Sequence, residues 1–542
     1  MSGARPRLTS WLLSLAAAGA IVLPTVSSGA LAASHRPAAP GKGGTLVITQ
    51  QTEPDSLDNA HTILGPSYDV FSLIYDTLVV QDSPSTYSGE IASSWTVSKN
   101  GLVYTFHIRP GIKFSNGDPL TAADVAFTFN RILNPATKSP DLGVIGPIKN
   151  VTAPNPSTAV FTLTKPFAYE LSDLAVPYAG IQDAAVVQKE GANYGRNPMG
   201  SGPFELKSWV SGESITLVPN PYYHSHAPYD SNKGEAYLSQ IKFQFISNTE
   251  TQIAAMQSGQ VNLLESLPDP NYQQFKPNPN FVVDVYPSAG SSIYLEFKLT
   301  PNRKQMVAPF NQLQVRQAAG YAIDTPGMIT AANYGLGIVD YGLLPKGVDA
   351  YDPALQRIGF HYDPKKAEQL LSQAGWKPGA GGVRYKNGKP LQVSLWIFSN
   401  GSLPQDAQII ANNMDAVGFK VNIVNLPLAS FDAQFPKGKF QMDMDWFGWP
   451  NSTLLNVIAS VPLGSSSIPD PYLTKIEAQA ETTANLAARR KLYNEAQTYI
   501  LQHAYAIPLY SPESVSMWSK SVHGVVITSA DMFDFTDATV GG

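Results

Sequence analysis

Hydrophobic and polar positions follow their clearest pattern between residues 92 and 131. Every second residue from Tyr104 to Ile108 is large and apolar, which predicts a strand with one buried face. Thr121 is a good N-cap residue, and Asp124 three positions later can complete a capping box. The residues that follow place an apolar face on the resulting helix: Val125, Thr128, Phe129 and Ile132. The pattern predicts a strand, a turn and a capped helix in that order.

Similar patterns continue along the rest of the chain. Strands are predicted over residues 45–49, 391–398, 421–424 and 440–446, and helices over residues 68–78, 363–375 and 486–503. The helix at 363 begins with an Asp N-cap and a proline, and it ends at Gly375. Strands that alternate with helices are typical of an α/β protein.

The N-terminus has the parts of a secretory signal peptide. Arg5 and Arg7 precede an apolar run over residues 11–23, and Ala30-Leu31-Ala32 is a cleavage pattern of small residues. The apolar run is shorter than the roughly 20 residues that span a bilayer, although an uncleaved anchor is the alternative. Residues 1–33 are therefore expected to be removed on export, and residues 34–43, rich in Ala, Pro and Gly, to form a linker.

Composition narrows the class of protein. The chain has 542 residues, a formal net charge of −5 and no cysteine. Its length predicts more than one domain, and its charge gives no basic surface for nucleic acid. Without cysteine there is no disulfide, no thiol nucleophile and no attachment point for a lipid after the signal peptide. The mature protein is expected to be periplasmic or secreted.

Several motifs in order along the chain resemble the extracellular solute-binding proteins of family 5, the dipeptide, oligopeptide and nickel group that serves ABC importers. The first is the stretch from Ala92 to Arg131 with Trp95 and Arg109-Pro110-Gly111. The others follow at intervals: Asn197 to Phe204, Ser258 to Asn262, Val315 to Asp324, Tyr362 to Trp376, and Ile507-Pro508-Leu509. Each motif alone is weak, but together they span nearly the whole mature chain.

The resemblance implies a bilobal α/β fold of the periplasmic-binding-protein type (type II, cluster C-like), with the ligand held between two lobes. Lobe one would comprise residues 44–287 and 505–542, with a family-specific subdomain at about 82–199. Lobe two would comprise residues 288–504. Two connecting segments, near 287–290 and 504–508, would form the hinge on which the lobes close.

The resemblance also implies where the ligand binds. Ligand contacts are expected from loops and strand ends that face the cleft. Seven residues are the candidates: His61, Tyr68, Tyr294, Trp396, Phe398, Trp446 and Trp449. The alternative for the tryptophans is that they pack in the core, as aromatic residues of strands commonly do.

The sequence departs from the peptide-binding members after Trp449. Those members carry an Asp shortly after this tryptophan, and it pairs with the ligand's α-ammonium group. Here residues 450–453 contain no acidic residue, and strand alternation directs Asp443 and Asp445 away from the face of Trp446. A buried ammonium without a carboxylate is costly. The solute is thus expected to be an oligopeptide or peptide-like compound, with a sugar, an opine or another non-peptide solute as alternatives.

No catalytic or metal motif supports an enzyme. The phosphate-binding loop, the H-E-x-x-H motif and the G-x-S-x-G elbow are all missing from the sequence. His224 and His226 have ligand spacing but lack a close third ligand. We therefore expect no metal, no cofactor and no catalysis, with a secreted hydrolase or peptide-handling chaperone as the alternative. The expected partners are the solute and the membrane permease of an ABC importer, and the protein is expected to be a monomer.

Overall fold

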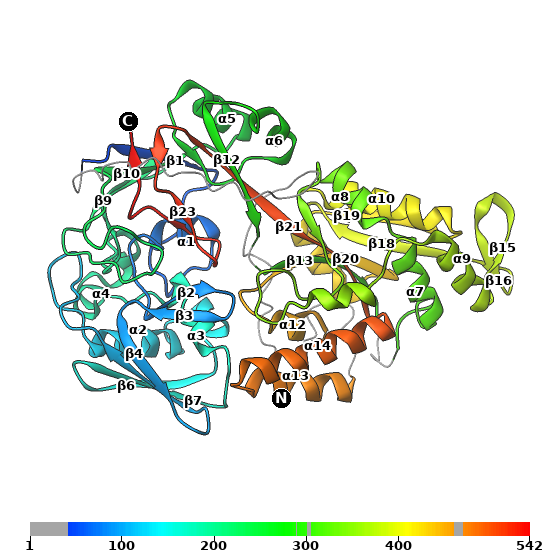
Figure 1. The fold of residues 1–542 in the computed structure, drawn as a ribbon, viewed down its shortest axis with the longest axis horizontal. Helices are drawn as coiled ribbons and strands as arrows, with labels where there is room; N and C mark the ends of the chain where they lie inside the picture. The colour runs from blue at the N-terminus through cyan, green and yellow to red at the C-terminus, as the bar shows by residue number, and fades with distance from the viewer. Residues whose placement is uncertain (1–41, 289, 301–304, 460–469, 542) are drawn as a thin grey trace.

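The computed structural model describes residues 42–288, 290–300, 305–459 and 470–541. The predicted signal peptide and all but the last two residues of the predicted linker lie outside this part of the chain. Figure 1 shows two lobes side by side, joined by the long strand β21 (Ala506–Ser519). The two-lobed α/β architecture is the one that the sequence predicts.

One large sheet runs through both lobes. Its strands in the first lobe are β1 (Thr45–Gln50), β8 (Phe204–Val210), β9 (Ser214–Pro219), β10 (Gln240–Phe245), β11 (Leu263–Leu264) and β12 (Phe281–Pro287). Those in the second lobe are β13 (Ser291–Phe297), β14 (Gly337–Val339), β18 (Gln392–Phe398), β19 (Lys420–Leu426) and β20 (Met442–Gly448). The order is β19-β18-β20-β13-β21-β11-β1-β10-β9-β8, and both β12 and β14 also pair with β21.

Strand β21 changes partner as it passes from one lobe to the other. Its residues 506–510 pair with β13 in the second lobe, and residues 513–519 pair with β12 in the first. The Ser288 N–H donates to the Pro512 carbonyl at 3.1 Å, so the two connecting segments contact each other. The sequence places the return crossing at residues 504–508. The structure places it later, between Pro512 and Glu513, because residues 506–510 pair with β13 and residues 510–512 with β14, both in the second lobe.

A smaller sheet of the first lobe confirms the clearest sequence pattern. Strands β4 (Ala92–Val97), β5 (Val103–Ile108), β7 (Thr158–Leu163) and β6 (Ile148–Asn155) lie in that order. Helix α2 (Ala122–Leu133) packs on this sheet and begins with the predicted capping box. The Thr121 hydroxyl accepts from the Ala123 N–H at 3.3 Å, and Asp124 Oδ2 accepts from the Thr121 N–H at 2.9 Å.

Helix α1 (Gly65–Phe71) begins earlier and ends sooner than the predicted 68–78. A longer helix would use the carbonyls of Leu73 and Ile74 internally. Instead they accept hydrogen bonds from the N–H groups of Phe204, at 3.0 Å, and Gly202, at 2.9 Å. Gly200 allows this approach, since a Cβ there would lie 2.1 Å from the Ile74 carbonyl oxygen. A contact with a distant turn therefore ends the helix.

The helices of the second lobe include two that the sequence predicts well. Helix α9 (Pro364–Gln373) begins at Asp363, whose Oδ1 accepts from the Lys366 N–H at 2.9 Å. Helix α14 (Leu486–His503) buries Tyr493, Ala496 and Ile500. The other long helices here are α7 (Leu313–Ala322), α8 (Thr325–Ala332), α10 (Leu403–Ala416) and α13 (Pro471–Thr482).

Shorter elements complete the described chain. The helices are α3 (Glu170–Asp173), α4 (Ala184–Glu190), α5 (Thr249–Ser258), α6 (Asp269–Phe275), α11 (Leu428–Gln434) and α12 (Leu454–Ala459). Short paired strands are β2 (Val79–Ser83) with β3 (Thr86–Gly89), β15 (Lys377–Pro378) with β16 (Arg384–Lys386) and β17 (Lys389–Pro390), β22 (Val522–His523) with β25 (Thr539–Val540), and β23 (Val526–Ile527) with β24 (Phe533–Asp534).

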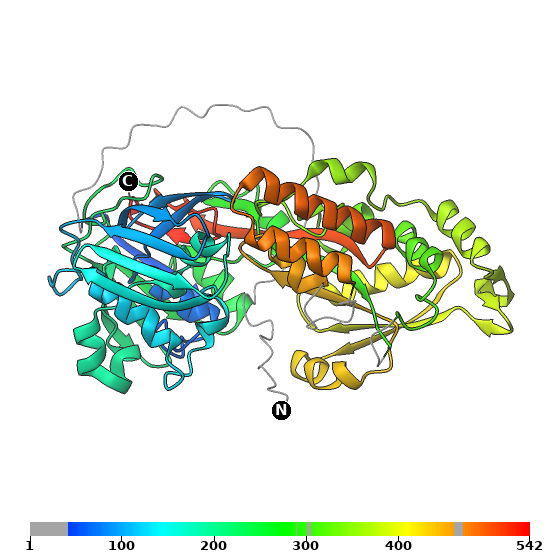
Figure 2. The same ribbon diagram turned by 90° about the horizontal axis from the view of Figure 1, so that it is seen from below.

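The lobes also contact each other away from β21. Figures 1 and 2 show α13 and α14 (orange) between the rest of the second lobe and the small sheet of the first. Lys165 Nζ lies 2.7 Å from Glu481 Oε2, and the Ala168 N–H donates to the Glu481 carbonyl at 2.8 Å. The guanidinium of Arg489 lies 4.8 Å from the ring centre of Tyr169. These contacts close one side of the space between the lobes.

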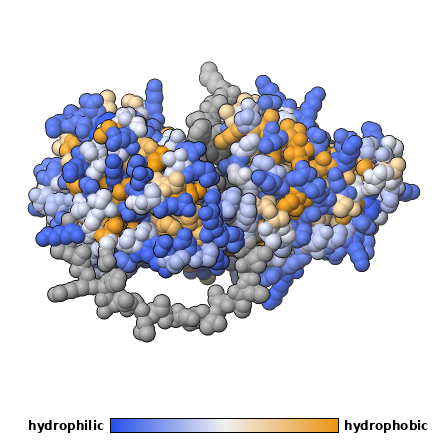
Figure 3. All heavy atoms as spheres, turned by 90° about the horizontal axis from the view of Figure 1, so that it is seen from above, coloured by the Kyte–Doolittle hydropathy of each residue, from blue (hydrophilic) through white to orange (hydrophobic). Residues whose placement is uncertain are grey.

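The outer surface is mainly hydrophilic in the view of Figure 3, with hydrophobic patches over each lobe. Within the described residues, no helix combines the length and the hydropathy that a membrane span requires. The hydrophobic side chains instead form several internal clusters. One of them joins residues of the small sheet in the first lobe with residues of α13 and α14 in the second.

An ion pair between Arg131 and Asp58 ties α2 to the loop that leads into α1. Arg131 Nη1 donates to Asp58 Oδ1 at 2.7 Å and to Gln182 Oε1 at 2.9 Å. The buried Asp58 carboxylate also accepts from the Ala60 N–H at 3.1 Å. Burial alone would raise the pKa of Asp58, but the hydrogen bond and charge of Arg131 hold it below its usual value.

Replacing Arg131 by Met should lower the free energy of unfolding by about 3 kcal/mol, because it leaves the Asp58 carboxylate buried without its cation. Urea denaturation of the two proteins at neutral pH measures the difference. Lys189→Met is the matched control, since its side chain is 79% exposed and lies 3.5 Å from Glu190. That change should cost less than about 1 kcal/mol. Equal losses from the two substitutions would contradict the assignment.

Candidate functional site

Two adjoining cavities lie between the lobes. The first encloses about 1120 Å³ and the second about 1030 Å³, both counted with their openings to solvent. Each is lined by residues of both lobes, and the two share Asp69 and Asp531. Volumes of this order suit a small solute held in a cleft. The names first cavity and second cavity are kept below.

Helix α1 supplies the first-lobe wall. Pro66 stands in the first turn, where a missing N–H costs nothing. Tyr68 lines the second cavity, and its ring packs against Tyr178 at 4.9 Å between centres. Asp69 lines both cavities, and its Oδ2 accepts a hydrogen bond from Gln50 Nε2 at 3.3 Å. The helix thus presents an aromatic ring and a carboxylate side by side.

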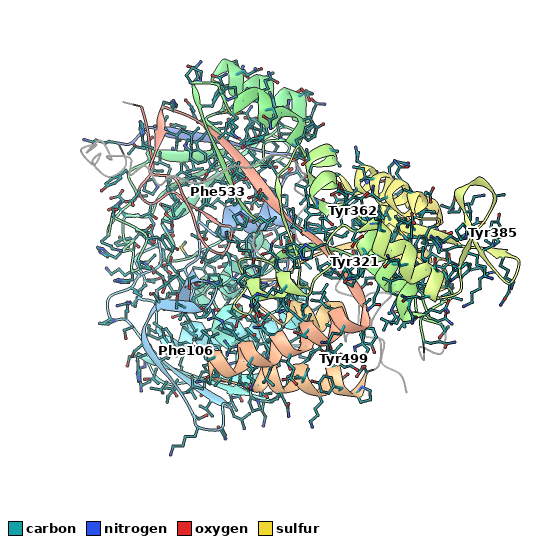
Figure 4. All side chains as sticks on the ribbon, turned by 45° about the vertical axis from the view of Figure 1, so that its right-hand side comes forward. Phe106, Tyr321, Tyr362, Tyr385, Tyr499 and Phe533 are labelled. Atoms are coloured by element: carbon teal, nitrogen blue, oxygen red, sulfur yellow. The ribbon has the colours of Figure 1, made fainter. Side chains whose placement is uncertain are left out.

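The tip of the β23–β24 hairpin supplies more of the first-lobe wall. The Thr528 N–H donates to the Met532 carbonyl at 2.8 Å, and the Asp531 N–H donates to the Thr528 carbonyl at 3.0 Å. This tight turn holds Asp531 at φ 61°, a left-handed conformation that aspartate tolerates better than most residues. Phe533 follows it and lines the first cavity; Figure 4 labels it in the first lobe, far from Tyr385 at the outer end of the second.

Strand β20 and the loop after it supply the second-lobe wall. Trp446 pairs with Ile293 of β13, and both side chains line the first cavity. Trp449 lines the second cavity, and its N–H donates to the Gly290 carbonyl at 3.2 Å. Gly290 has φ 65°, and a Cβ there would lie 1.7 Å from the Trp449 carbonyl oxygen. Only glycine fits between the first connecting segment and the Trp449 loop.

A buried polar network supports the same wall. Tyr510 of β21 donates to Asp406 Oδ2 at 2.7 Å, as does the Ser402 hydroxyl at 2.9 Å. Asn333 Nδ2 donates to Asp406 Oδ1 at 2.7 Å. Burial raises the pKa of Asp406 to about 6, against the opposing effect of these donors. Tyr510, Ser402 and Asn333 all line the first cavity, so Asp406 orients three polar groups toward it.

The seven residues expected to touch ligand separate into two groups. Tyr68, Trp446 and Trp449 line the cavities. The other four, His61, Tyr294, Trp396 and Phe398, do not line either cavity. The exposed His61 ring lies 3.8 Å from Asp58 Oδ2. The side chains of Tyr294 and Phe398 are buried in cores, and Trp396 stacks on Phe440 at 4.8 Å.

Strand geometry explains why Tyr294 is not at the cavity. Ile293 and Trp446 form one cross-strand pair facing the cavity, and the next pair, Tyr294 with Asp445, points to the opposite face of the sheet. There Tyr294 stacks on Phe447 at 6.4 Å, and it belongs to the cluster beneath α14. Tyr294, the residue that the family resemblance pointed to, is thus buried. Its neighbour Ile293 lines the cavity instead.

Comparisons with known proteins decide the family. The model of the bacterial extracellular solute-binding proteins, family 5, matches residues 86–461. This chain belongs to that family. It is the solute-binding component of an ABC importer and is not an enzyme, as the sequence predicts. The hydrolase alternative is therefore set aside.

Individual relatives agree with this assignment. The glutathione-binding protein GsiB of Escherichia coli O1:K1 is 28% identical over 483 residues, which cover 86% of this chain and 88% of GsiB. The probable D,D-dipeptide-binding periplasmic protein DdpA of Escherichia coli K12 is 27% identical over 504 residues, or 89% and 91%. The structure of the periplasmic binding protein DppA from Helicobacter pylori, in complex with the peptide STSA, matches with a TM-score of 0.69 at 24% identity, covering 93% of this chain and 99% of DppA.

The charged side chains that line this solute-binding protein's two cavities are all carboxylates. They are Asp69, Asp173, Glu265, Glu513 and Asp531, contributed by segments far apart in the chain. Sequence reasoning considered the segment after Trp449 and the strand residues Asp443 and Asp445. It missed the five cavity acids, since no local pattern distinguishes a cavity aspartate from a surface one. Residues 450–453 contain no acid, but Asp69, Asp173 and Asp531 line the same cavity as Trp449.

Burial shifts the pKa of Asp69, Asp173, Glu265 and Glu513 upward. It raises the pKa of Asp69 to about 7 and that of Glu265 well above its usual range, with the charge of Asp69 adding to the effect on Glu265. Burial also raises the pKa of Glu513, although the Gly337 N–H, 3.0 Å from its Oε2, and the charge of Lys346 oppose it. The raised pKa values favour the protonated form of these carboxyl groups close to neutral pH.

A third cavity inside the first lobe holds a second group of acids. Asp76, Glu90 and Asp534 line it, and Asp230 lies beside them. Burial raises the pKa of Asp76 to about 7 and that of Asp230 to about 8. The described residues contain no group of three potential ligands arranged to hold a metal ion, and His224, from the predicted pair, is exposed with its ring near the Lys233 carbonyl.

The stability of the ligand-free protein should fall as the pH rises from about 5 to about 8. A carboxyl group whose pKa is raised by folding binds its proton more tightly in the folded state. Its contribution is therefore complete below the unfolded pKa near 4, and it is lost as the pH approaches the folded value near 7. Thermal unfolding across this range measures the trend.

Asp69→Asn should flatten this pH dependence, because it removes one of the titrating groups while keeping the shape of the side chain. Glu213→Gln, a surface carboxylate that is 66% exposed, is the control and should leave the slope unchanged. A melting temperature of the parent protein that rises between about pH 5 and about pH 8 would contradict the argument.

Proposed function

We propose that the two cavities between the lobes form the solute site, and that the solute is a peptide-like compound carrying an amine. The observation that supports this most directly is the shared wall, because Asp69 of the first lobe and the Trp446 and Trp449 segments of the second converge on one space. The names of GsiB and DdpA, a glutathione binder and a probable D,D-dipeptide binder, support peptide-like chemistry.

The two lobes would then close on the solute while strand β21 continues to connect them. We keep residues 44–287 as the main part of the first lobe, with its subdomain at about 82–199. Because residues 506–512 of β21 pair with strands of the second lobe, we extend the second lobe from 288–504 to about residue 512, let the first lobe resume at 513 instead of 505, and move the second hinge segment to residues 512–513. Rotation there and at Ser288 and Gly290 would open the cavities, while the contacts of Lys165 and Arg489 across the lobes would separate. Closure after binding would present both lobes together to the membrane permease of the importer.

Several features of the biological setting belong to the same proposal. The protein is exported, loses residues 1–33, and works as a monomer in the periplasm or outside the cell. DdpA is itself named as a periplasmic protein, in agreement with this location. A sugar or an opine remains the alternative solute, because tryptophan side chains also stack on sugar rings.

Replacing Trp446 or Trp449 by Ala should abolish the stabilisation that a bound solute confers, because each removes an aromatic wall of the cavity. The measurement is a thermal-shift screen of short peptides, opines, oligosaccharides and nickel against the purified mature protein. A solute at about 100 times its Kd stabilises the protein by about 2.7 kcal/mol.

Trp396→Ala is the control, since Trp396 stacks on Phe440 and does not line a cavity. It is expected to lower the melting temperature of the free protein but to retain the solute-induced shift. If both cavity variants kept the full shift while Trp396→Ala lost it, the site would lie elsewhere in the second lobe.

A further inference from the structure

The charged side chains of the described residues that line the two cavities are all acidic. Five carboxylates line the two cavities, and no lysine, arginine or histidine of the described chain does so. Asp69 and Asp531 lie where the cavities meet, and Glu265 is close enough to Asp69 for their charges to interact. Lys346 acts on Glu513 from outside the lining. A cationic group on a solute would find a carboxyl group to pair with in either cavity.

This arrangement disfavours a free carboxylate on the solute. An ordinary dipeptide or amino acid carries one, and it would be buried among carboxylates without a basic partner. The N-terminus of α10 does reach the first cavity through Ser402 and Leu403. However, Asp406 in its first turn already places a buried carboxylate at that end of the helix, where a helix dipole favours an anion.

The rest of the lining suits an organic cation better than a metal ion. The described residues form no group of three or more potential ligands that could hold a metal ion. Aromatic rings also line the cavities, including Tyr68, Tyr286, Trp446 and Trp449. Aromatic faces attract ammonium groups and pack well against methylene chains.

We propose that the solute carries at least two positive charges and no free carboxylate, as in a linear diamine or an amidated basic peptide. The proposal rests on the two cavities being the solute site. It narrows the peptide-like class to compounds in which each ammonium or guanidinium group meets a cavity carboxylate and the chain between them lies on the aromatic rings.

Binding of such a solute should release protons. Burial raises the pKa of Asp69 to about 7, and the groups that face it are Glu265, Asp531, Tyr68 and Gln50. None of these is a cation, so the charge of the solute is what favours the ionised carboxylate. Affinity should therefore rise from about pH 6 to about pH 8, and the heat of binding should depend on the ionisation enthalpy of the buffer.

Calorimetry with matched pairs of probes tests the proposal. Cadaverine is lysine without its carboxylate, and Lys-Ala amide is Lys-Ala without its free acid. Cadaverine should bind at least about tenfold more tightly than lysine, and Lys-Ala amide at least about tenfold more tightly than Lys-Ala. Comparing cadaverine with Lys-Ala amide also shows whether the protein prefers a linear diamine or an amidated basic peptide. Equal or tighter binding of lysine and Lys-Ala, or no binding of either cation by the folded protein, would overturn the proposal.

Neutralising single carboxylates separates charge from shape. Asp69→Asn and Glu265→Gln should each weaken binding of the preferred cation by about tenfold and reduce proton release, whereas the exposed Glu213→Gln should do neither. The zwitterion Ala-Phe distinguishes the hypothesis about the location of the site from the hypothesis about the charge of the solute. If it binds tightly and loses affinity in Trp446→Ala, the cavity is the solute site and the dication assignment is wrong. If Trp446→Ala and Trp449→Ala leave all binding intact, the site itself is wrong.

Discussion

The pairing of β21 with strands of both lobes is the constraint on which the solute site depends. A strand can satisfy its backbone groups on each edge only once, and β21 gives residues 506–510 to β13 and residues 513–519 to β12. The change of partner leaves Pro512 and Glu513 at the cavity, and Pro512 also accepts the hydrogen bond from the other connecting segment. The floor of the site is thus fixed by sheet pairing, while its walls belong to separate lobes.

The cavity carboxylates impose a cost that the fold does not offset by itself. Arg131 compensates Asp58 within the first lobe, but no comparable cation faces Asp69 or Glu265. Protonation relieves most of this cost in the empty protein, which is why their pKa values are raised. The proposed cationic solute would replace these protons, and the complex would recover the stability that the free protein loses at neutral pH. Stability and recognition therefore depend on the same groups.

The sequence predicts local structure and family well but identifies only part of the site. The capping box at Thr121 and the N-cap at Asp363 depend on neighbours three residues away, so both could be predicted from the sequence alone. The end of α1 could not, because it depends on Gly202, more than a hundred positions later in the chain. Strand alternation correctly places the side chains of Trp446 and Asp445 on opposite faces of the sheet. Predicting that Ile293 rather than Tyr294 lines the cavity would also require the register of β13 against β20.

The motifs that identify the family do not include the acidic residues that line the two cavities. Gly200 and Gly202 lie in one family motif and in this chain let that turn approach Ile74, and Arg131 lies in another and pairs with Asp58. Asp69 and Asp531, in contrast, lie outside every motif that the resemblance uses. Fold and ligand choice can therefore change independently. A relative that binds glutathione or a D,D-dipeptide establishes the architecture, and the charges that line this chain's own cavities must decide its solute.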